Sequence, residues 1–151
     1  MAAVDVETQA TIARPRHEVA AYASNPGNAT AWYANITEVK GDCGGPVETG
    51  AEFAFVAEFL GRRLVYTYEV VEHVPGTRLV MRTAEGPFPM ETIYEWEDVA
   101  DGKTRMTLRN RGEPSGFARI GAPVLSRAMR RANNKDLARL KGILEAEPGN
   151  S

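Results

Sequence analysis

The first residues of the chain alternate between two kinds of side chain. Val, Val, Thr, Ala and Ile occupy the even positions of Val4–Ile12, and polar residues occupy the odd ones. This period of two predicts a strand with one buried face. Pro15 ends the strand and suits the first turn of a helix, so we expect a short helix around Val19–Ala23. Asn25-Pro26-Gly27 stops that helix, and a second short helix is expected around Ala29–Tyr33.

From Ile36 onward the period of two returns in short runs separated by turn residues. We expect turns at Gly44-Gly45-Pro46, Gly61, Pro75-Gly76, Gly86-Pro87 and Asp101-Gly102. The inward face of these runs comprises Phe53, Phe55, Ala57, Phe59, Leu64, Tyr66, Tyr68, Val70, Leu79, Met81, Met90, Thr92, Tyr94, Trp96, Met106 and Leu108. With the first strand, the runs predict an antiparallel meander of about seven strands.

The period changes to that of a helix after Gly112. Apolar residues then recur at helical spacing, which predicts one long helix from about Arg119 to Glu147, roughly 40 Å in length. Its first half contains the small residues Gly121, Ala122, Ala128 and Ala132, and its second half the bulky residues Leu137, Leu140, Ile143 and Leu144. Small residues on a buried face leave space beside the sheet, whereas the bulky half can pack tightly and seal one end.

Composition is that of an ordinary globular protein. The chain has 151 residues with 25% charged and 43% hydrophobic side chains, so we expect one domain over residues 1–151. A net charge of −2 argues against a nucleic-acid-binding protein. Val19–Thr37, the longest uncharged stretch, is too polar for a membrane span. The single cysteine, Cys43, has no internal partner, and the N-terminus resembles no secretion signal, so a cytoplasmic location is expected.

The order of the expected elements resembles the helix-grip fold of the START-like superfamily. Four stretches carry this resemblance more closely: Ala13–Val19, Asn25-Pro26 with Trp32, Tyr68–Pro75 with Arg78-Leu79, and Thr104–Leu108. Together they are similar to the polyketide cyclase/dehydrase-type branch, also called SRPBCC proteins. The resemblance implies an α+β fold in which a curved sheet grips the long helix. It also implies a largely apolar cavity between them that holds a hydrophobic ligand.

The residues of the inward face suit such a cavity, although they could equally interdigitate into a filled core. The resemblance favours the cavity, with walls that include Phe55, Tyr66, Met90, Tyr94 and Leu108. The full set of candidate ligand-binding residues is Trp32, Phe53, Phe55, Tyr66, Tyr68, Met81, Met90, Thr92, Tyr94, Leu108, Asn110, Ala128 and Asn133.

Two of these candidates have a competing interpretation. Trp32, with Tyr33, either forms part of a lid over the cavity or anchors its segment onto the sheet. Asn133 interrupts the apolar stripe of the long helix, so it either contacts a ligand or lies where the stripe turns to solvent.

Residues for catalysis are not evident in the sequence. His17 and His73 are expected in solvated positions, and no spacing of His and Cys suits a metal, so we expect no metal and no cofactor. Two hypotheses therefore remain: an enzyme that cyclises or dehydrates a polyketide-like chain, and a non-catalytic carrier or sensor for a lipid, quinone or aromatic metabolite. Because the inward positions are nearly all apolar or neutral, they favour the carrier.

The charged residues raise two further possibilities. Residues 101–151 carry 11 basic and 5 acidic groups, and Arg119, Arg127, Arg130 and Arg131 form a basic patch on the long helix. This patch is either a solvated face or a site that docks an acyl carrier protein or steers an anionic ligand.

A protein that acts as an interaction module would expose an apolar outer face of its sheet. That face is expected to be solvated here, since it carries Glu52, Glu58, Glu91, Glu95, Glu97, Arg105 and Arg109.

Overall fold

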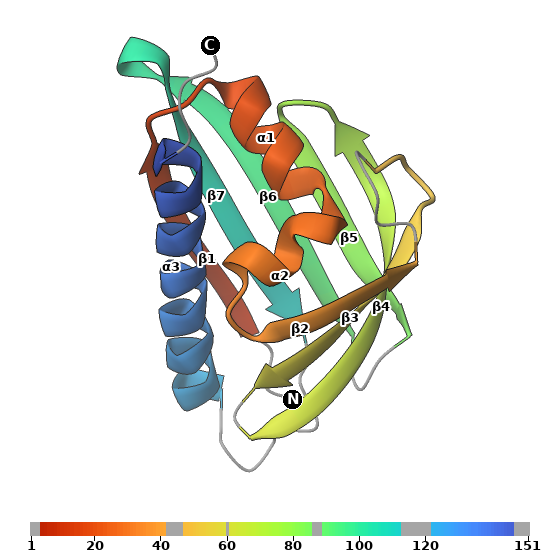
Figure 1. Ribbon diagram of the computed structural model, residues 1–151. Helices are drawn as coiled ribbons and strands as arrows, with labels where there is room; N and C mark the ends of the chain where they lie inside the picture. The colour runs from red at the N-terminus through yellow and green to blue at the C-terminus, as the bar shows by residue number, and fades with distance from the viewer. Residues whose placement is uncertain (1–3, 42–46, 60, 86–88, 113–121, 147–151) are drawn as a thin grey trace.

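A single antiparallel sheet and one long helix dominate the computed structural model, which describes residues 4–41, 47–59, 61–85, 89–112 and 122–146 (Figure 1). The strands are β1 (Val4–Ile12), β2 (Ile36–Gly41), β3 (Glu52–Phe59), β4 (Arg62–Val74), β5 (Arg78–Glu85), β6 (Met90–Val99) and β7 (Lys103–Gly112). The helices are α1 (Arg16–Ser24), α2 (Ala29–Trp32) and α3 (Ala122–Ala146), with single turns η1 (Pro26–Asn28) and η2 (Ala100–Gly102). The expected helix-grip arrangement is confirmed.

The sheet has seven strands in the order β1-β7-β6-β5-β4-β3-β2. All but one of the neighbouring pairs are consecutive in the sequence, as in a meander. The exception is β1, which pairs antiparallel with β7 from Val4 opposite Gly112 to Ile12 opposite Thr104. At the turn before β7, Asp101 and Gly102 both have positive φ angles, which suits the expected Asp-Gly turn. The helices α1 and α2 cross the concave side of the sheet, and α3 lies along β1 (Figure 1).

The C-terminal half of α3 packs tightly, as its leucines predict. Leu137, Leu140 and Leu144 are buried in the main core with residues from β1, α1 and β7. Polar contacts hold the same end in place: Arg14 Nε donates to the Leu144 carbonyl at 2.7 Å, and the Glu145 carboxylate accepts from the Ala13 backbone N–H at 2.8 Å. This end of the molecule is therefore closed. The proposed start of the helix at Arg119, and its end at Glu147, lie outside the described residues, as does Cys43.

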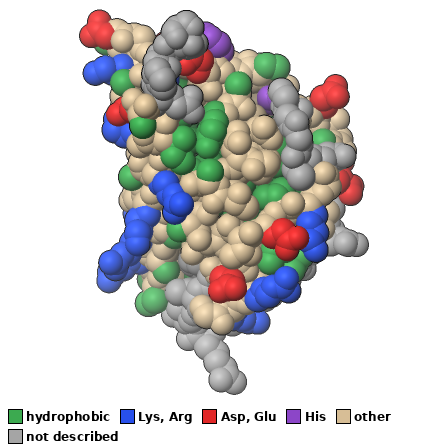
Figure 2. All heavy atoms as spheres, viewed as in Figure 1, with side chains coloured by type: hydrophobic (Ala, Val, Ile, Leu, Met, Phe, Trp, Pro, Cys, Tyr) green, Lys and Arg blue, Asp and Glu red, His purple; other side chains and the backbone are tan. Residues whose placement is uncertain are grey.

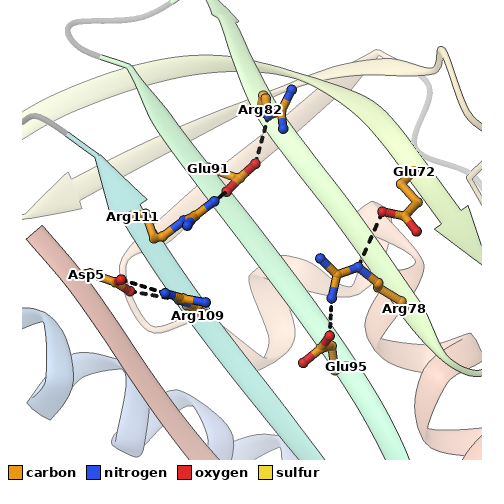
Figure 3. A network of polar contacts seen from close by, with 8 residues as sticks. All are labelled: Asp5, Glu72, Arg78, Arg82, Glu91, Glu95, Arg109 and Arg111. Atoms are coloured by element: carbon orange, nitrogen blue, oxygen red, sulfur yellow. Dashed lines mark hydrogen bonds and ion pairs between the residues drawn. The ribbon is translucent and has the colours of Figure 1, made fainter.

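The convex face of the sheet is covered by ion pairs between neighbouring strands (Figure 3). Arg109 on β7 donates two hydrogen bonds to Asp5 on β1, at 2.8 and 2.6 Å. Glu91 on β6 accepts from Arg82 on β5 and from Arg111 on β7. Arg78 similarly bridges Glu72 and Glu95. The expected solvated outer face is confirmed, because the side chains of Arg78, Arg82, Arg105 and Arg109 on it are 36–62% exposed. None of the described helices is long and apolar enough to cross a lipid bilayer.

Candidate functional site

A cavity of about 150 Å³ lies between the N-terminal half of α3 and the sheet. It sits where α3 faces the β2, β3 and β4 strands, at the end opposite the packed leucines (Figure 1). Its described walls are Tyr33, Asn35, Ile36, Phe55, Ala57, Leu64, Tyr66, Tyr68, Met90, Thr92, Asn110, Leu125, Met129, Ala132, Asn133 and Asp136. A cavity of this volume accommodates a molecule with one or two small rings. The inward face of the sheet is thus hollow at this end.

The structure places part of the predicted site in this wall. The candidates that line the cavity are Phe55, Tyr66, Tyr68, Met90, Thr92, Asn110 and Asn133. They come from β3, β4, β6, β7 and α3, and each strand residue among them lies at the inward parity. Whether they bind a ligand stays a prediction.

Phe53, Met81 and Leu108 lie outside the cavity wall. All three belong to the main core cluster and are at most 2% exposed. They have the correct parity, but they belong to a packed core cluster that also contains residues of α1 and the leucine half of α3. The expectation that Leu108 lines the cavity was therefore wrong, because parity identifies the face of a residue and says nothing of its position along the sheet.

Trp32 and Tyr94 also lie behind the wall rather than in it. Trp32 is fully buried and packs on Tyr33 and Tyr94, with ring centroids 4.1 and 5.8 Å apart. The Tyr33 and Tyr94 hydroxyls are hydrogen-bonded at 2.6 Å, and only Tyr33 reaches the cavity. The expectation that Tyr94 lines the cavity was wrong. Trp32 takes the anchoring role, since it fixes α2 on the sheet and supports the tyrosine that lines the wall.

Ala128 was predicted to face the cavity, and this was also wrong. It lies in the wall of a second hollow on the other side of α3, together with Val124 and Arg131. The cavity side of the helix is formed by Leu125, Met129 and Ala132. Successive residues of an α-helix are rotated by about 100° about its axis, so Ala128 and Met129 point to different sides.

A chain of neutral hydrogen bonds crosses the cavity wall. Asn133 Nδ2 donates to Asn110 Oδ1 at 2.8 Å, and Asn110 Nδ2 donates to Thr92 Oγ1 at 2.9 Å. The Thr92 hydroxyl lies 3.4 Å from the Tyr68 hydroxyl and donates to it. Burial raises the pKa of Tyr68, so this phenol stays protonated and can donate a hydrogen bond to an oxygen inside the cavity. Asn133, which interrupts the apolar stripe of the long helix, therefore lines the cavity.

One buried carboxylate, Asp136, was missed by the sequence analysis. It is 3% exposed, lines the cavity, and accepts a hydrogen bond from the Ala34 backbone N–H at 3.0 Å. Burial raises the pKa of Asp136 to about 6. The available signal was its spacing, because Asp136 lies three residues after Asn133 and thus on a neighbouring part of the same helix face. The buried face of the helix was drawn as a narrow apolar stripe through Leu137, and this stripe left Asp136 out.

We expect Asp136→Asn to stabilise the protein more at neutral than at acid pH. The folded protein binds the carboxyl proton of Asp136 more tightly than the unfolded chain does, because burial raises the pKa of this group from 3.8 to about 6. The wild-type protein therefore loses stability as the pH rises between these two values. The gain in unfolding free energy from Asp136→Asn should be about 1–2 kcal/mol larger at about pH 7.5 than at about pH 4.5. Urea titrations of both proteins at the two pH values measure this. An equal gain at both would contradict the assigned burial effect.

The other ionisable candidates lie elsewhere. His17 is exposed and His73 is half-buried, and neither lies in the described wall of the cavity. Across the described part of the chain, no group of three or more His, Cys, Asp or Glu side chains is arranged to hold a metal ion. Arg127, Arg130 and Arg131 are exposed, as expected. The polar groups that the described wall of the cavity offers are thus phenols, amides, one threonine hydroxyl and the Asp136 carboxyl.

Solved structures with the same fold support this architecture. A START superfamily protein from Mycobacterium smegmatis is 14% identical, with 93% of this chain and 97% of that chain covered and a TM-score of 0.77. Zhui aromatase/cyclase from Streptomyces sp. R1128 is 17% identical, with 95% and 94% covered and a TM-score of 0.73. A major latex-like protein from Panax ginseng is 11% identical, with 95% and 98% covered and a TM-score of 0.65.

At these identities the structures establish the fold alone. A comparison with curated proteins found no match. The sequence itself matches a family model over residues 3–145, which is nearly the whole chain and includes every described wall residue of the cavity. The chain therefore belongs to the family described as polyketide cyclase / dehydrase and lipid transport.

Proposed function

We propose that the chain binds a small hydrophobic molecule with a hydrogen-bonding oxygen in the cavity between α3 and the sheet. A polyketide-like compound, a lipid and an aromatic metabolite all fit this description. The observation that carries the proposal is the apolar cavity with one polar wall, the chain of Asn133, Asn110, Thr92 and Tyr68. Apolar walls with a few placed polar groups are typical of small-molecule sites. The family description points to the same class of ligand.

Catalysis is a second candidate, which Asp136 favours. Cyclisation or dehydration of a polyketide-like chain needs a base to remove a proton beside a carbonyl and donors to stabilise the resulting enolate. Asp136, with its pKa near 6, is ionised at neutral pH and lines the cavity. The Tyr68 phenol supplies a donor. An enzyme would lose turnover in Asp136→Asn while it retains ligand affinity, whereas a carrier would bind equally well and have no turnover to lose.

The carrier hypothesis has its own support. The cavity wall offers one carboxylate within its described residues, and the remaining polar groups are neutral phenols, amides and a hydroxyl. Burial raises the pKa values of Tyr33, Tyr66 and Tyr68, so all three phenols stay protonated at neutral pH. Neutral donors hold a ligand without attacking it. Binding is therefore the function we place first.

An acyl carrier protein remains a proposed partner. The exposed guanidinium groups of Arg127, Arg130 and Arg131 on α3 support it, because acidic carrier proteins would be attracted to such a patch.

The binding proposal predicts saturable binding of 2-naphthol, a neutral compound whose two rings suit the cavity volume. From its size we expect a Kd on the order of 10 μM. Thr92→Val removes the central hydroxyl of the polar wall with little change in shape, and should weaken 2-naphthol binding about tenfold. Naphthalene, which lacks the oxygen, is the matched control and should bind both proteins alike. Fluorescence titration measures all four affinities, and absence of saturable binding for both compounds would overturn the proposal.

A further inference from the structure

A second hollow, of about 510 Å³, adjoins the cavity on the outer side of α3. It lies between the turn that follows α2, at Ala34 and Asn35, and the exposed side of the helix. Asn35, Ala132 and Asp136 contribute to the walls of both hollows. Because three residues form this shared boundary, a ligand seated in the cavity lies directly beside the outer hollow. Ala132 is the smallest side chain of the boundary and leaves the most room between the two spaces.

Basic side chains surround the outer hollow. Arg127, Arg131 and Lys135 recur at intervals of four residues, so they form one row along α3. All three are exposed, and Lys and Arg side chains accumulate along the α3 side of the face shown in Figure 2. Asp136 is the acidic side chain in the described wall, and its carboxylate already accepts the Ala34 N–H. Three cations against one carboxylate leave this hollow with a net positive charge.

The row on α3 differs from three arginines of the sheet. On the convex face Arg109 is paired with Asp5, and Arg111 and Arg82 are paired with Glu91. Among the described residues, no carboxylate forms an ion pair with Arg127, Arg131 or Lys135. The positive charge beside the cavity is therefore available to an external anion.

We propose that the outer hollow binds the carboxylate of a small amphipathic ligand whose hydrophobic part occupies the cavity. This inference rests on the proposed binding function and narrows its ligand class to hydrophobic carboxylates. The apolar part passes Ala132 into the cavity, and the carboxylate stays among Arg127, Arg131 and Lys135. Charge-assisted hydrogen bonds from Arg suit a carboxylate, because the guanidinium group can donate two parallel bonds.

Two probes of equal shape test the charge of the ligand: 2-naphthoate and its neutral analogue 2-naphthamide. The wild-type protein should bind 2-naphthoate about tenfold more tightly at low ionic strength, and added salt should reduce this preference. The double variant Arg127→Gln/Arg131→Gln should lose the preference while its affinity for 2-naphthamide stays unchanged. The matched control Arg63→Gln/Lys103→Gln removes the same net charge at exposed positions outside the hollow and outside the basic patch of α3, and should retain the preference. Isothermal titration calorimetry gives each affinity.

The outcomes separate this inference from the proposed function. If both probes bind the wild-type protein equally, or if Arg127→Gln/Arg131→Gln keeps the preference, the carboxylate site is overturned and the binding function stands. If both double variants lose the preference to the same extent, the overall charge of the protein explains it and the site is again overturned. If neither of the two probes nor 2-naphthol binds, the binding function itself fails. Loss of the preference in the Arg127/Arg131 variant alone supports the site.

Discussion

Ala57→Phe should reduce the affinity for 2-naphthol by at least about 100-fold while the protein remains folded. Ala57 lies on β3 in the wall of the cavity and does not contribute to the described wall of the outer hollow. A phenyl ring at this position occupies the space that a ring-sized ligand needs. Its insertion next to an existing void costs less than insertion into packed atoms, so we expect the fold to persist. Fluorescence titration measures binding, and thermal unfolding followed by circular dichroism measures the fold.

Ala138→Phe is the matched control. Ala138 is an exposed residue of α3, so the same change there adds the ring on the surface. Binding of 2-naphthol should match that of the wild-type protein. If Ala57→Phe folds and still binds 2-naphthol with wild-type affinity, the ligand does not occupy the cavity.

Truncation of Leu140 should cost much more stability than truncation of Leu125, although both leucines are at most 2% exposed. Leu140 lies in the packed core, where Leu140→Ala opens a new void and should cost about 3–4 kcal/mol. Leu125 borders the existing cavity and already lacks neighbours on one side, so Leu125→Ala should cost about half as much. Both changes replace Leu by Ala in α3, so the difference in helix propensity cancels.

Urea unfolding of the two variants under identical conditions measures this difference. An equal or larger loss for Leu125→Ala would show that its end of α3 is packed as tightly as the leucine half, against the presence of a cavity there.

Much of the fold was predictable because local patterns report directly on secondary structure. The alternation in Val4–Ile12 and the inward residues of the meander matched the observed strands, and the change of period marked α3. The pairing of β1 with β7 does not follow from any local pattern. It was not predicted from the sequence, and the resemblance implied only that a curved sheet grips the long helix.

The site was predicted less completely, for a geometric reason. Alternation identifies the inward side chains, and Phe55 and Phe53 share that property equally. Which of them lines the cavity depends on what packs above each position, and α1 and the leucine half of α3 cover only one end of the sheet. Asp136 was missed because a buried acidic residue contradicts the apolar pattern that defines a core face. Such exceptions are concentrated at functional sites, where burial alters the pKa values of ionisable groups.

The position of β1 has a consequence for synthesis of the chain. Thr8 on β1 contacts Leu108 on β7, 100 residues further along the sequence. The ribosome must therefore produce the chain as far as Gly112 before β1 has its full partner strand, and as far as Ala146 before all of α3 can cover it. The first strand to be made is among the last to be enclosed. Until then the nascent chain presents the unpaired backbone groups and apolar face of β1 to its surroundings, the kind of surface that chaperones shield.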